Sequence, residues 1–148
     1  MKQLLIGLFL LAPSLAFSSD KKNEAFFCDA IATSIAGESE VRTKYNKRID
    51  ILTDTAAAEC DWSHKWAEAI GQALTYGELE GKQPAMIIFH DISKKQNKNT
   101  IGVLIHMSKT LGIDLLYINV DRISGDMEFY GSYNASKDIL FGFTDETS

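Results

Sequence analysis

Long apolar runs, histidine clusters and surplus basic charge are all missing from most of this 148-residue chain. Beyond residue 11, no segment approaches the roughly 18 consecutive apolar residues of a membrane-spanning helix, which argues against a stable membrane anchor. The three histidines stand apart, and no cysteines and histidines have the spacing of a zinc finger. The 15 basic and 20 acidic residues give a net charge of −5, which argues against a protein that coats nucleic acid through a broad basic surface.

The chain begins with the features of a secretory signal peptide. After a positively charged start, Leu4 to Leu11 is an unbroken apolar run, and small residues follow at Ala16 and Ser18. We therefore expect residues 1–18 to be a signal peptide and the remainder to be exported, either to the periplasm or out of the cell. The roughly 130 remaining residues suit one domain with a single core, which we place at 24–148.

Cys28 and Cys60 are the two cysteines of the chain. In an exported protein such a pair can form one disulfide, which would close a loop of about 31 residues and contribute about 3–4 kcal/mol. Two buried free thiols are the alternative, because a domain of this size can fold without a crosslink. The sequence leaves both open.

Hydrophobic periodicity and turn residues predict an alternation of helices and strands. We expect helices at 24–36, from an N-cap at Ser63 to about 79, and at 100–111. Strands are expected at 38–43, 47–52, 56–62, 86–89 and 115–120, with edge strands or loosely packed additions at 127–130 and 139–143. Lys94 to Asn99 has the composition of a solvated charged loop. This order predicts an α/β fold, a three-layer αβα sandwich with a mixed central sheet.

A row of polar side chains follows the helix expected after Ser63. Lys65, Glu68, Gln72 and Tyr76 succeed one another at steps of three, four and four residues, so they share an arc of about 80° on the helix. Such a row is also found on ordinary solvated helix faces. The acidic strand directly before the helix favours the functional interpretation.

That strand places carboxylates on one face. Side chains alternate along a strand, so Glu59 and Asp61 point the same way, and pairing with the preceding strand can bring Asp50 beside Glu59. Two adjacent carboxylates resist joint ionisation unless a cation lies between them. The pattern therefore predicts a site for Mg²⁺ or Mn²⁺, with Lys65 near enough to stabilise charge on a phosphate.

Together, these residues resemble the PD-(D/E)XK nuclease superfamily. The resemblance runs from Gly37 to Phe89 and is carried by Glu40, Arg48-Ile49-Asp50, Ala58-Glu59-Cys60-Asp61 and the helix segment from Lys65 to Gln72. The spacing from Gln72 to Tyr76 is similar to the Q-x-x-x-Y element of the RecB-type branch. The resemblance implies a restriction-endonuclease-like core.

The resemblance also implies roles for individual residues. It implies metal ligation by Asp50, Glu59 and Glu40, and catalysis or positioning by Lys65, Gln72 and Tyr76. Asp61 and Glu68 are expected to support the site as neighbouring acids. The chain departs from the pattern at one position, because the superfamily has a lysine two residues after the glutamate and this chain has Asp61 there. Lys65 would then supply the missing positive charge from the helix.

Two functions follow from this interpretation. The first is an exported nuclease-like enzyme that uses Mg²⁺ or Mn²⁺ to hydrolyse phosphodiester bonds in DNA or RNA. The alternative is a catalytically inactive nuclease-like scaffold, acting as a binding module in the periplasm for a protein partner that the sequence does not identify. The acidic net charge and the missing lysine favour this alternative.

Overall fold

The computed structural model describes residues 20–143, so the expected signal peptide lies outside the described part of the chain. Within that part there are three α-helices, one short 3₁₀ helix and seven strands. The helices are α1 (Glu24–Ser34), η1 (Ser63–Lys65), α2 (Trp66–Glu80) and α3 (Lys98–Leu111). The strands are β1 (Glu38–Arg42), β2 (Arg48–Leu52), β3 (Ala56–Trp62), β4 (Gln83–Asp91), β5 (Asp114–Val120), β6 (Met127–Asn134) and β7 (Ile139–Gly142).

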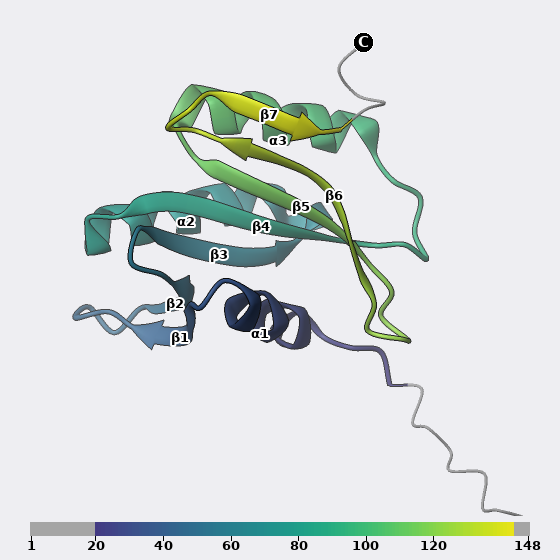
Figure 1. The fold of residues 1–148 in the computed structure, drawn as a ribbon, viewed down its shortest axis with the longest axis horizontal. Helices are drawn as coiled ribbons and strands as arrows, with labels where there is room; N and C mark the ends of the chain where they lie inside the picture. Colours follow the sequence, from purple (N-terminus) through teal and green to yellow (C-terminus); the bar gives the residue numbers. More distant parts are fainter. Residues whose placement is uncertain (1–19, 144–148) are drawn as a thin grey trace, which may run out of the picture.

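The strands of the described residues form one mixed sheet, and their spatial order is their order along the chain, from β1 to β7 (Figure 1). The central strands β3, β4 and β5 are parallel, and the neighbours on either side pair antiparallel. Helices α2 and α3 connect the parallel strands. Because such crossovers are right-handed and the sheet grows in one direction, both helices lie on the same face. The α/β fold with a mixed sheet is therefore confirmed.

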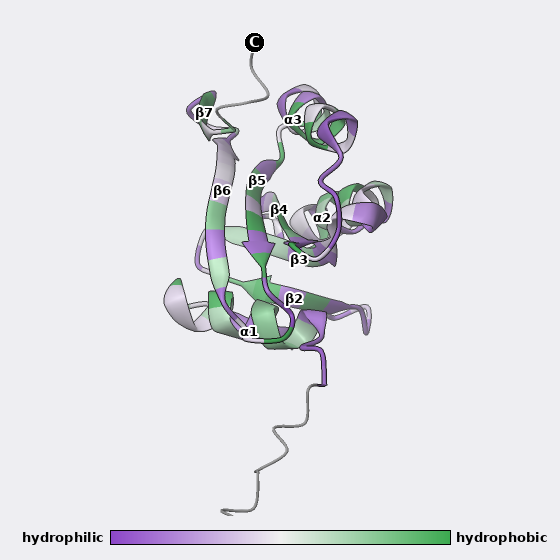
Figure 2. Cartoon of the chain, turned by 90° about the vertical axis from the view of Figure 1, so that its right-hand side faces the viewer, coloured by the Kyte–Doolittle hydropathy of each residue, from purple (hydrophilic) through white to green (hydrophobic). Residues whose placement is uncertain are grey.

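Both faces of the central sheet are covered. Met86 and Ile88 of β4 pack in a core cluster with α2 and α3, whereas Ile87 and Phe89 pack with α1. Figure 2 shows α2 and α3 together on one side of the sheet and α1 away from them. A strand buried on both faces needs apolar residues at successive positions, which explains the continuous apolar run in β4. No helix in the described residues has the length and apolarity needed to cross a membrane.

The predicted N-cap at Ser63 is wrong. The chain leaves β3 through η1, so α2 begins at Trp66 and its N-cap position is Lys65, whose side chain caps nothing. The Ser63 hydroxyl instead lies 3.3 Å from Nδ1 of His90. At its other end the helix stops at Gly81, which adopts the left-handed conformation (φ 61°) that glycine allows.

The sheet forks between β2 and β3. These strands pair only through Ile51 with Ala58 and Leu52 with Ala57. Beyond that point the Oδ2 atom of Asp50 accepts the hydrogen bond of the Cys60 backbone N–H at 2.9 Å, in place of a strand carbonyl. A disulfide between Cys28 and Cys60 fastens α1 to β3 at the same level. The fork leaves an opening between the strands, and the candidate site lies there.

Candidate metal and catalytic site

A cavity of about 290 Å³ opens at the fork. We call it the acid cavity. It is lined by Glu24, Arg48, Asp50, Glu59, Asp61, Lys65, Glu68, Gln72 and Tyr76. The structure thus brings together every residue of the site expected from the sequence except Glu40.

The row along α2 forms one wall of the acid cavity. The amide of Gln72 donates a hydrogen bond to Glu68 Oε1 at 3.1 Å, which ties two successive turns together. Tyr76 closes the inner end, where its ring packs with Ile49 and Ala57. Burial, followed by the nearby charge of Glu59, raises the pKa of Tyr76 and keeps its hydroxyl protonated. The polar row is therefore the face of α2 that turns toward the acids.

The acids of the cavity meet in two pairs. Glu59 adjoins Asp50, and burial, then the charge of Asp50 and a hydrogen bond with it, raise the pKa of Glu59 to about 10. Glu24 adjoins Asp61, and burial, then the charge of Asp61, raise the pKa of Glu24 to about 7. Burial also raises the pKa of Asp61, although the N–H of Trp62 donates to its Oδ1 at 2.8 Å. Ionising both acids of either pair is therefore unfavourable in free energy, because the charges are buried and repel each other.

The donor set of the acid cavity fits a hard divalent cation. Five carboxyl groups face only two basic side chains, Arg48 and Lys65. The Oε2 atom of Glu59 is buried without a hydrogen-bond partner, although a buried carboxylate oxygen ordinarily has one. All the candidate ligands are oxygen atoms, and one or two carboxylates with water are what Mg²⁺ and Mn²⁺ bind. The Asp50–Glu59 pair is the best-placed ligand set.

A second combination of residues can be set aside as a metal site. Cys28, Asp50 and Cys60 present ligand atoms within 4.8 Å of one another. Both sulfur atoms are already joined in the disulfide, and metal ligation by cysteine requires a thiolate. Of the two states that the sequence left open for the cysteines, the structure has the disulfide, which serves to hold α1 against β3.

Lys65 brings a positive charge to the mouth of the acid cavity. Its Nζ atom lies 3.9 Å from Oδ1 of Asp61, and its side chain is 49% exposed. The ammonium group from η1 therefore lies beside the carboxylate of Asp61, at one edge of the Asp50–Glu59 pair. Asp61 is buried, but the ammonium group of Lys65 lies at the exposed end of a half-exposed side chain and only 3.9 Å away, so it can turn toward an arriving anion.

Glu40 lies outside the acid cavity. Its carboxylate pairs with Arg48 at 3.3 Å, and both side chains are more than half exposed. The backbone of Glu40 takes the left-handed conformation (φ 56°), which turns this residue away from the regular course of β1. It lines a small neighbouring cavity of about 40 Å³, whose wall also includes Glu24, Arg48 and Asp50.

Glu24 and Arg48 are the lining residues that sequence reasoning did not find. Glu24 lies four residues before Cys28, one turn along α1, so a disulfide from Cys28 to Cys60 brings it near Asp61. The cysteine pair was therefore the available signal for Glu24. Arg48 was visible as part of the motif around Asp50, but nothing in the motif distinguished it from an ordinary strand residue.

The chain is similar over part of its length to a known viral protein. The chain is 36% identical over 89 residues to a KilA-N domain-containing protein of Acanthamoeba polyphaga mimivirus. The match covers 60% of this chain and 23% of that protein, so the chain corresponds to less than a quarter of its relative. No protein-family profile matches the chain. No solved structure matches it either.

Proposed function

We propose that this protein is an exported, Mg²⁺- or Mn²⁺-dependent nuclease that hydrolyses phosphodiester bonds in DNA or RNA. The observation that carries the proposal is the convergence of Asp50, Glu59 and Lys65 on one open cavity, from β2, β3 and the start of the following helix. Helices on both faces of the sheet support the finer interpretation of the fold as a three-layer αβα sandwich with a restriction-endonuclease-like core.

Asp50 and Glu59 are the proposed metal ligands, and Glu24 and Asp61 form a second acidic pair across the cavity. A bound divalent cation would supply Lewis-acid chemistry at a phosphate and offset the charge of the carboxylates. Because Asp50 also accepts the N–H of Cys60, its carboxylate is fixed in orientation before any ligand arrives. The site is therefore preorganised on strands.

The remaining residues of the wall act on the substrate. The Lys65 ammonium group stabilises the negative charge that builds up on a phosphate as a water attacks it. Gln72 is held by its hydrogen bond to Glu68 and presents its amide to the cavity, where it can orient a water or a phosphate oxygen. The protonated Tyr76 hydroxyl is a further donor at the inner end.

The disulfide supports the exported location that the signal-peptide features predict, because disulfides persist in oxidising compartments. The viral relative is named for a KilA-N domain and is similar to this chain over a segment of 89 residues. The nuclease assignment therefore depends on the geometry of the acid cavity.

The deciding experiment is cleavage by the purified protein. Labelled single-stranded DNA, double-stranded DNA and RNA are each incubated with Mg²⁺, with Mn²⁺ and with EDTA. Cleavage is expected with either metal and not with EDTA, and Asp50→Asn should lower the rate about 1,000-fold. Asp54→Asn is the matched control, because Asp54 is an exposed acid in the turn before β3 and does not line the cavity. Equal rates for the wild type and Asp50→Asn would refute the assignment.

One observation favours the alternative, a catalytically inactive scaffold that serves as a binding module. Lys65 pairs with Asp61, not with Glu59, so its charge lies at the edge of the metal-ligand pair. Calorimetric titration with Mn²⁺ separates the two functions when it accompanies the cleavage assay. Metal binding without cleavage of any of the three substrates would establish the scaffold.

A further inference from the structure

A second cavity, of about 200 Å³, lies on the other side of η1. We call it the basic cavity. It is formed where β3, β4 and β5 end, the edge of a parallel sheet at which ligands commonly bind. The 3₁₀ turn η1 lies between the two cavities. Its Lys65 lines the acid cavity, whereas its Ser63 and His64 line the basic cavity.

The basic cavity carries the opposite charge. Its lining includes Lys94, Lys95 and Arg122 together with two histidines, against the single acid Asp91. Within the described residues, the side chains of Lys94 and Lys95 make neither a hydrogen bond nor an ion pair, and both are exposed. These ammonium groups are therefore available to an anion.

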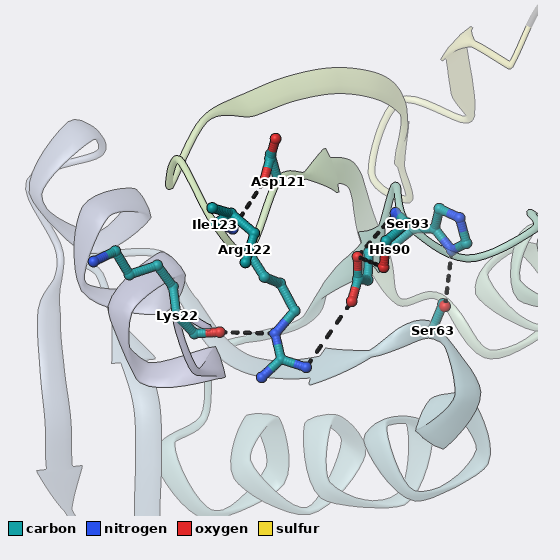
Figure 3. Close-up of polar contacts among 8 residues, drawn as sticks. Lys22, Ser63, His90, Ser93, Asp121, Arg122 and Ile123 are labelled. Carbon is teal, nitrogen blue, oxygen red and sulfur yellow. Dashed lines mark hydrogen bonds and ion pairs between the residues drawn. The ribbon is translucent and has the colours of Figure 1, made fainter. Parts of the chain in front are cut away.

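Arg122 is built into the wall by three contacts. Its guanidinium group lies over the ring of Trp62 at 4.8 Å, and its Nη1 lies 3.9 Å from Asp91 Oδ2. Its Nε donates a hydrogen bond to the Lys22 carbonyl at 2.8 Å (Figure 3). A guanidinium group has five N–H donors, and these contacts leave several of them for a ligand. A cation held in this way loses little conformational entropy when it binds an anion.

Asp91 holds Arg122 from the buried side. Its side chain is 7% exposed, and its Oδ1 accepts hydrogen bonds from the backbone and hydroxyl of Ser93 at 3.0 and 2.6 Å. Burial alone would raise the pKa of Asp91, but the Ser93 hydrogen bonds and the Arg122 charge together hold it below its usual value. Its other oxygen, Oδ2, makes no hydrogen bond and faces the guanidinium group at 3.9 Å, so the Arg122 charge is its partner.

His90 fixes the loop that carries the two lysines. One ring nitrogen lies 3.3 Å from the Ser63 hydroxyl and the other 3.1 Å from the Lys94 carbonyl, and the ring stacks on Tyr117. Figure 3 shows His90 facing Ser63 at the edge of this loop. The chain then enters α3, whose first turn contributes Thr100 to the lining and the positive end of a 14-residue helix.

The size and charge of the basic cavity define its ligand. Sites for drug-sized molecules usually occupy about 300–1,000 Å³, so this cavity fits a single anionic group better than a large ligand. Lysine and arginine side chains beside a helix N-terminus are a usual environment for phosphate. A duplex binds along a broad basic face, whereas one phosphate of a flexible single strand can enter a cavity whose cations are Lys94, Lys95 and Arg122.

We infer that the basic cavity binds a phosphate of a single-stranded nucleic acid, further along the strand whose scissile phosphate lies in the acid cavity. This inference rests on the proposed function. The two cavities then form one track on either side of η1, the acid cavity for cleavage and the basic cavity for holding the strand. Lys94, Lys95 and Arg122 make the contacts with the strand.

The test measures binding without cleavage. A fluorescein-labelled 12-nucleotide oligothymidylate is titrated with protein in EDTA, and anisotropy is followed between 50 and 200 mM salt. The double variant Lys94→Gln/Lys95→Gln should bind about tenfold more weakly, and the slope of log affinity against log salt should fall by about 1.4, about 0.7 for each phosphate that a lysine no longer neutralises. Thermal unfolding of each protein verifies that it is folded.

Lys109→Gln/Lys137→Gln is the matched control. Both lysines are exposed. Lys109 lies in the last turn of α3 and Lys137 follows β6, and both elements run back to the end of the parallel strands opposite the basic cavity. This variant therefore removes the same charge far from the cavity. It should keep the affinity and the salt slope of the wild type. Equal losses in the two double variants would overturn the inference, because net charge alone would then explain them.

Inorganic phosphate distinguishes the two sources of the ligand. Phosphate at 10 mM should compete with the oligothymidylate for the wild type. If Lys94→Gln/Lys95→Gln loses phosphate binding but keeps its affinity for the strand, the inference is overturned, because the cavity then serves free phosphate. Failure of the proposed function is seen separately, as strand binding that depends on Lys94 and Lys95 in a protein that does not cleave with Mg²⁺.

Discussion

The acid cavity and the basic cavity lie on either side of three residues of η1 and differ in almost every physical respect. The acid cavity has five carboxyl groups and two basic side chains, and its walls are β2, β3 and α2, with one residue each from α1 and η1. The basic cavity has one carboxyl group, and much of its wall is the loop between β4 and α3 together with Arg122 after β5. The net charge of −5 therefore describes neither cavity, and local charge decides what each can bind.

The two cavities are also held in place differently. In the acid cavity the disulfide and the Asp50 hydrogen bond join three elements of the backbone. In the basic cavity the fixed points are side chains, Arg122 on Trp62 and His90 on Ser63. Metal ligation and hydrolysis require accurate geometry, whereas the capture of a flexible strand tolerates movement of a loop.

The largest expected effect is that of Glu59→Gln, which should lower cleavage about 1,000-fold and yet stabilise the metal-free protein. The folded-state pKa of Glu59, about 10, lies above its ordinary value of 4.5. Its contribution to stability is thus complete below pH 4.5 and is lost as the pH rises toward 10.

In EDTA at pH 8 the variant should gain about 3 kcal/mol in the free energy of unfolding, and its stability should depend less on pH than that of the wild type. Urea unfolding at pH 5 and pH 8 measures both quantities. Arg122→Gln, in the basic cavity, is the comparison and should not remove the pH dependence. A Glu59→Gln protein less stable than the wild type at pH 8 would show that Glu59 is not a strained, buried acid.

Loss of the disulfide should weaken metal binding in the acid cavity more than strand binding in the basic cavity. Cys28→Ser/Cys60→Ser should lower the free energy of unfolding by about 3–4 kcal/mol. Because α1 carries Glu24, the folded variant should also bind Mn²⁺ more weakly, while oligothymidylate affinity in EDTA stays within about twofold of the wild type. Equal losses of metal and strand binding would show that the two cavities are not independent.

Lys65→Ala should reduce cleavage about 100-fold through kcat, because the ammonium group acts on charge that develops during the reaction. The side chain is half exposed, so the variant should fold normally. Lys65→Arg keeps the charge and should recover part of the rate. A rise in KM alone, with kcat unchanged, would show that Lys65 binds the strand and does not take part in the chemical step.

The smallest effect is expected for Glu40→Gln. Glu40 and Arg48 form an exposed pair outside the acid cavity, and such pairs contribute about 0–1 kcal/mol. Cleavage should change less than threefold. A loss comparable with that of Asp50→Asn would restore Glu40 to the metal site that the nuclease resemblance implies for it and would extend the acid cavity to β1.

Much of the fold and of the acid cavity was predictable because its residues are close in sequence. The step of four residues placed Glu68, Gln72 and Tyr76 on one face of α2, and strand alternation placed Glu59 and Asp61 together. Both rules act within a single element. The register of β2 and β3 then follows from a short connection and brings Asp50 to Glu59.

The features that were not predicted depend on packing between distant segments. Glu24 reaches the acid cavity only because α1 docks through a disulfide that the sequence left open. The sequence around Lys94 and Lys95 predicts only a solvated loop. Arg122, which completes the basic cavity, follows in the chain only after α3 and β5. Ser63 looked like an N-cap because the sequence does not reveal that a 3₁₀ turn precedes α2.

The strictly consecutive strand order has a kinetic consequence. Every strand of the described sheet pairs with its neighbour along the chain. The antiparallel pairings close short connections, whereas the parallel β3–β4 and β4–β5 pairings each span a helix. Closing short loops costs less chain entropy, and proteins with local topology fold faster than those with distant pairings. The antiparallel pairs β1–β2, β2–β3, β5–β6 and β6–β7 are therefore expected to form before the two parallel pairs, which must wait for α2 and α3 to cross the sheet.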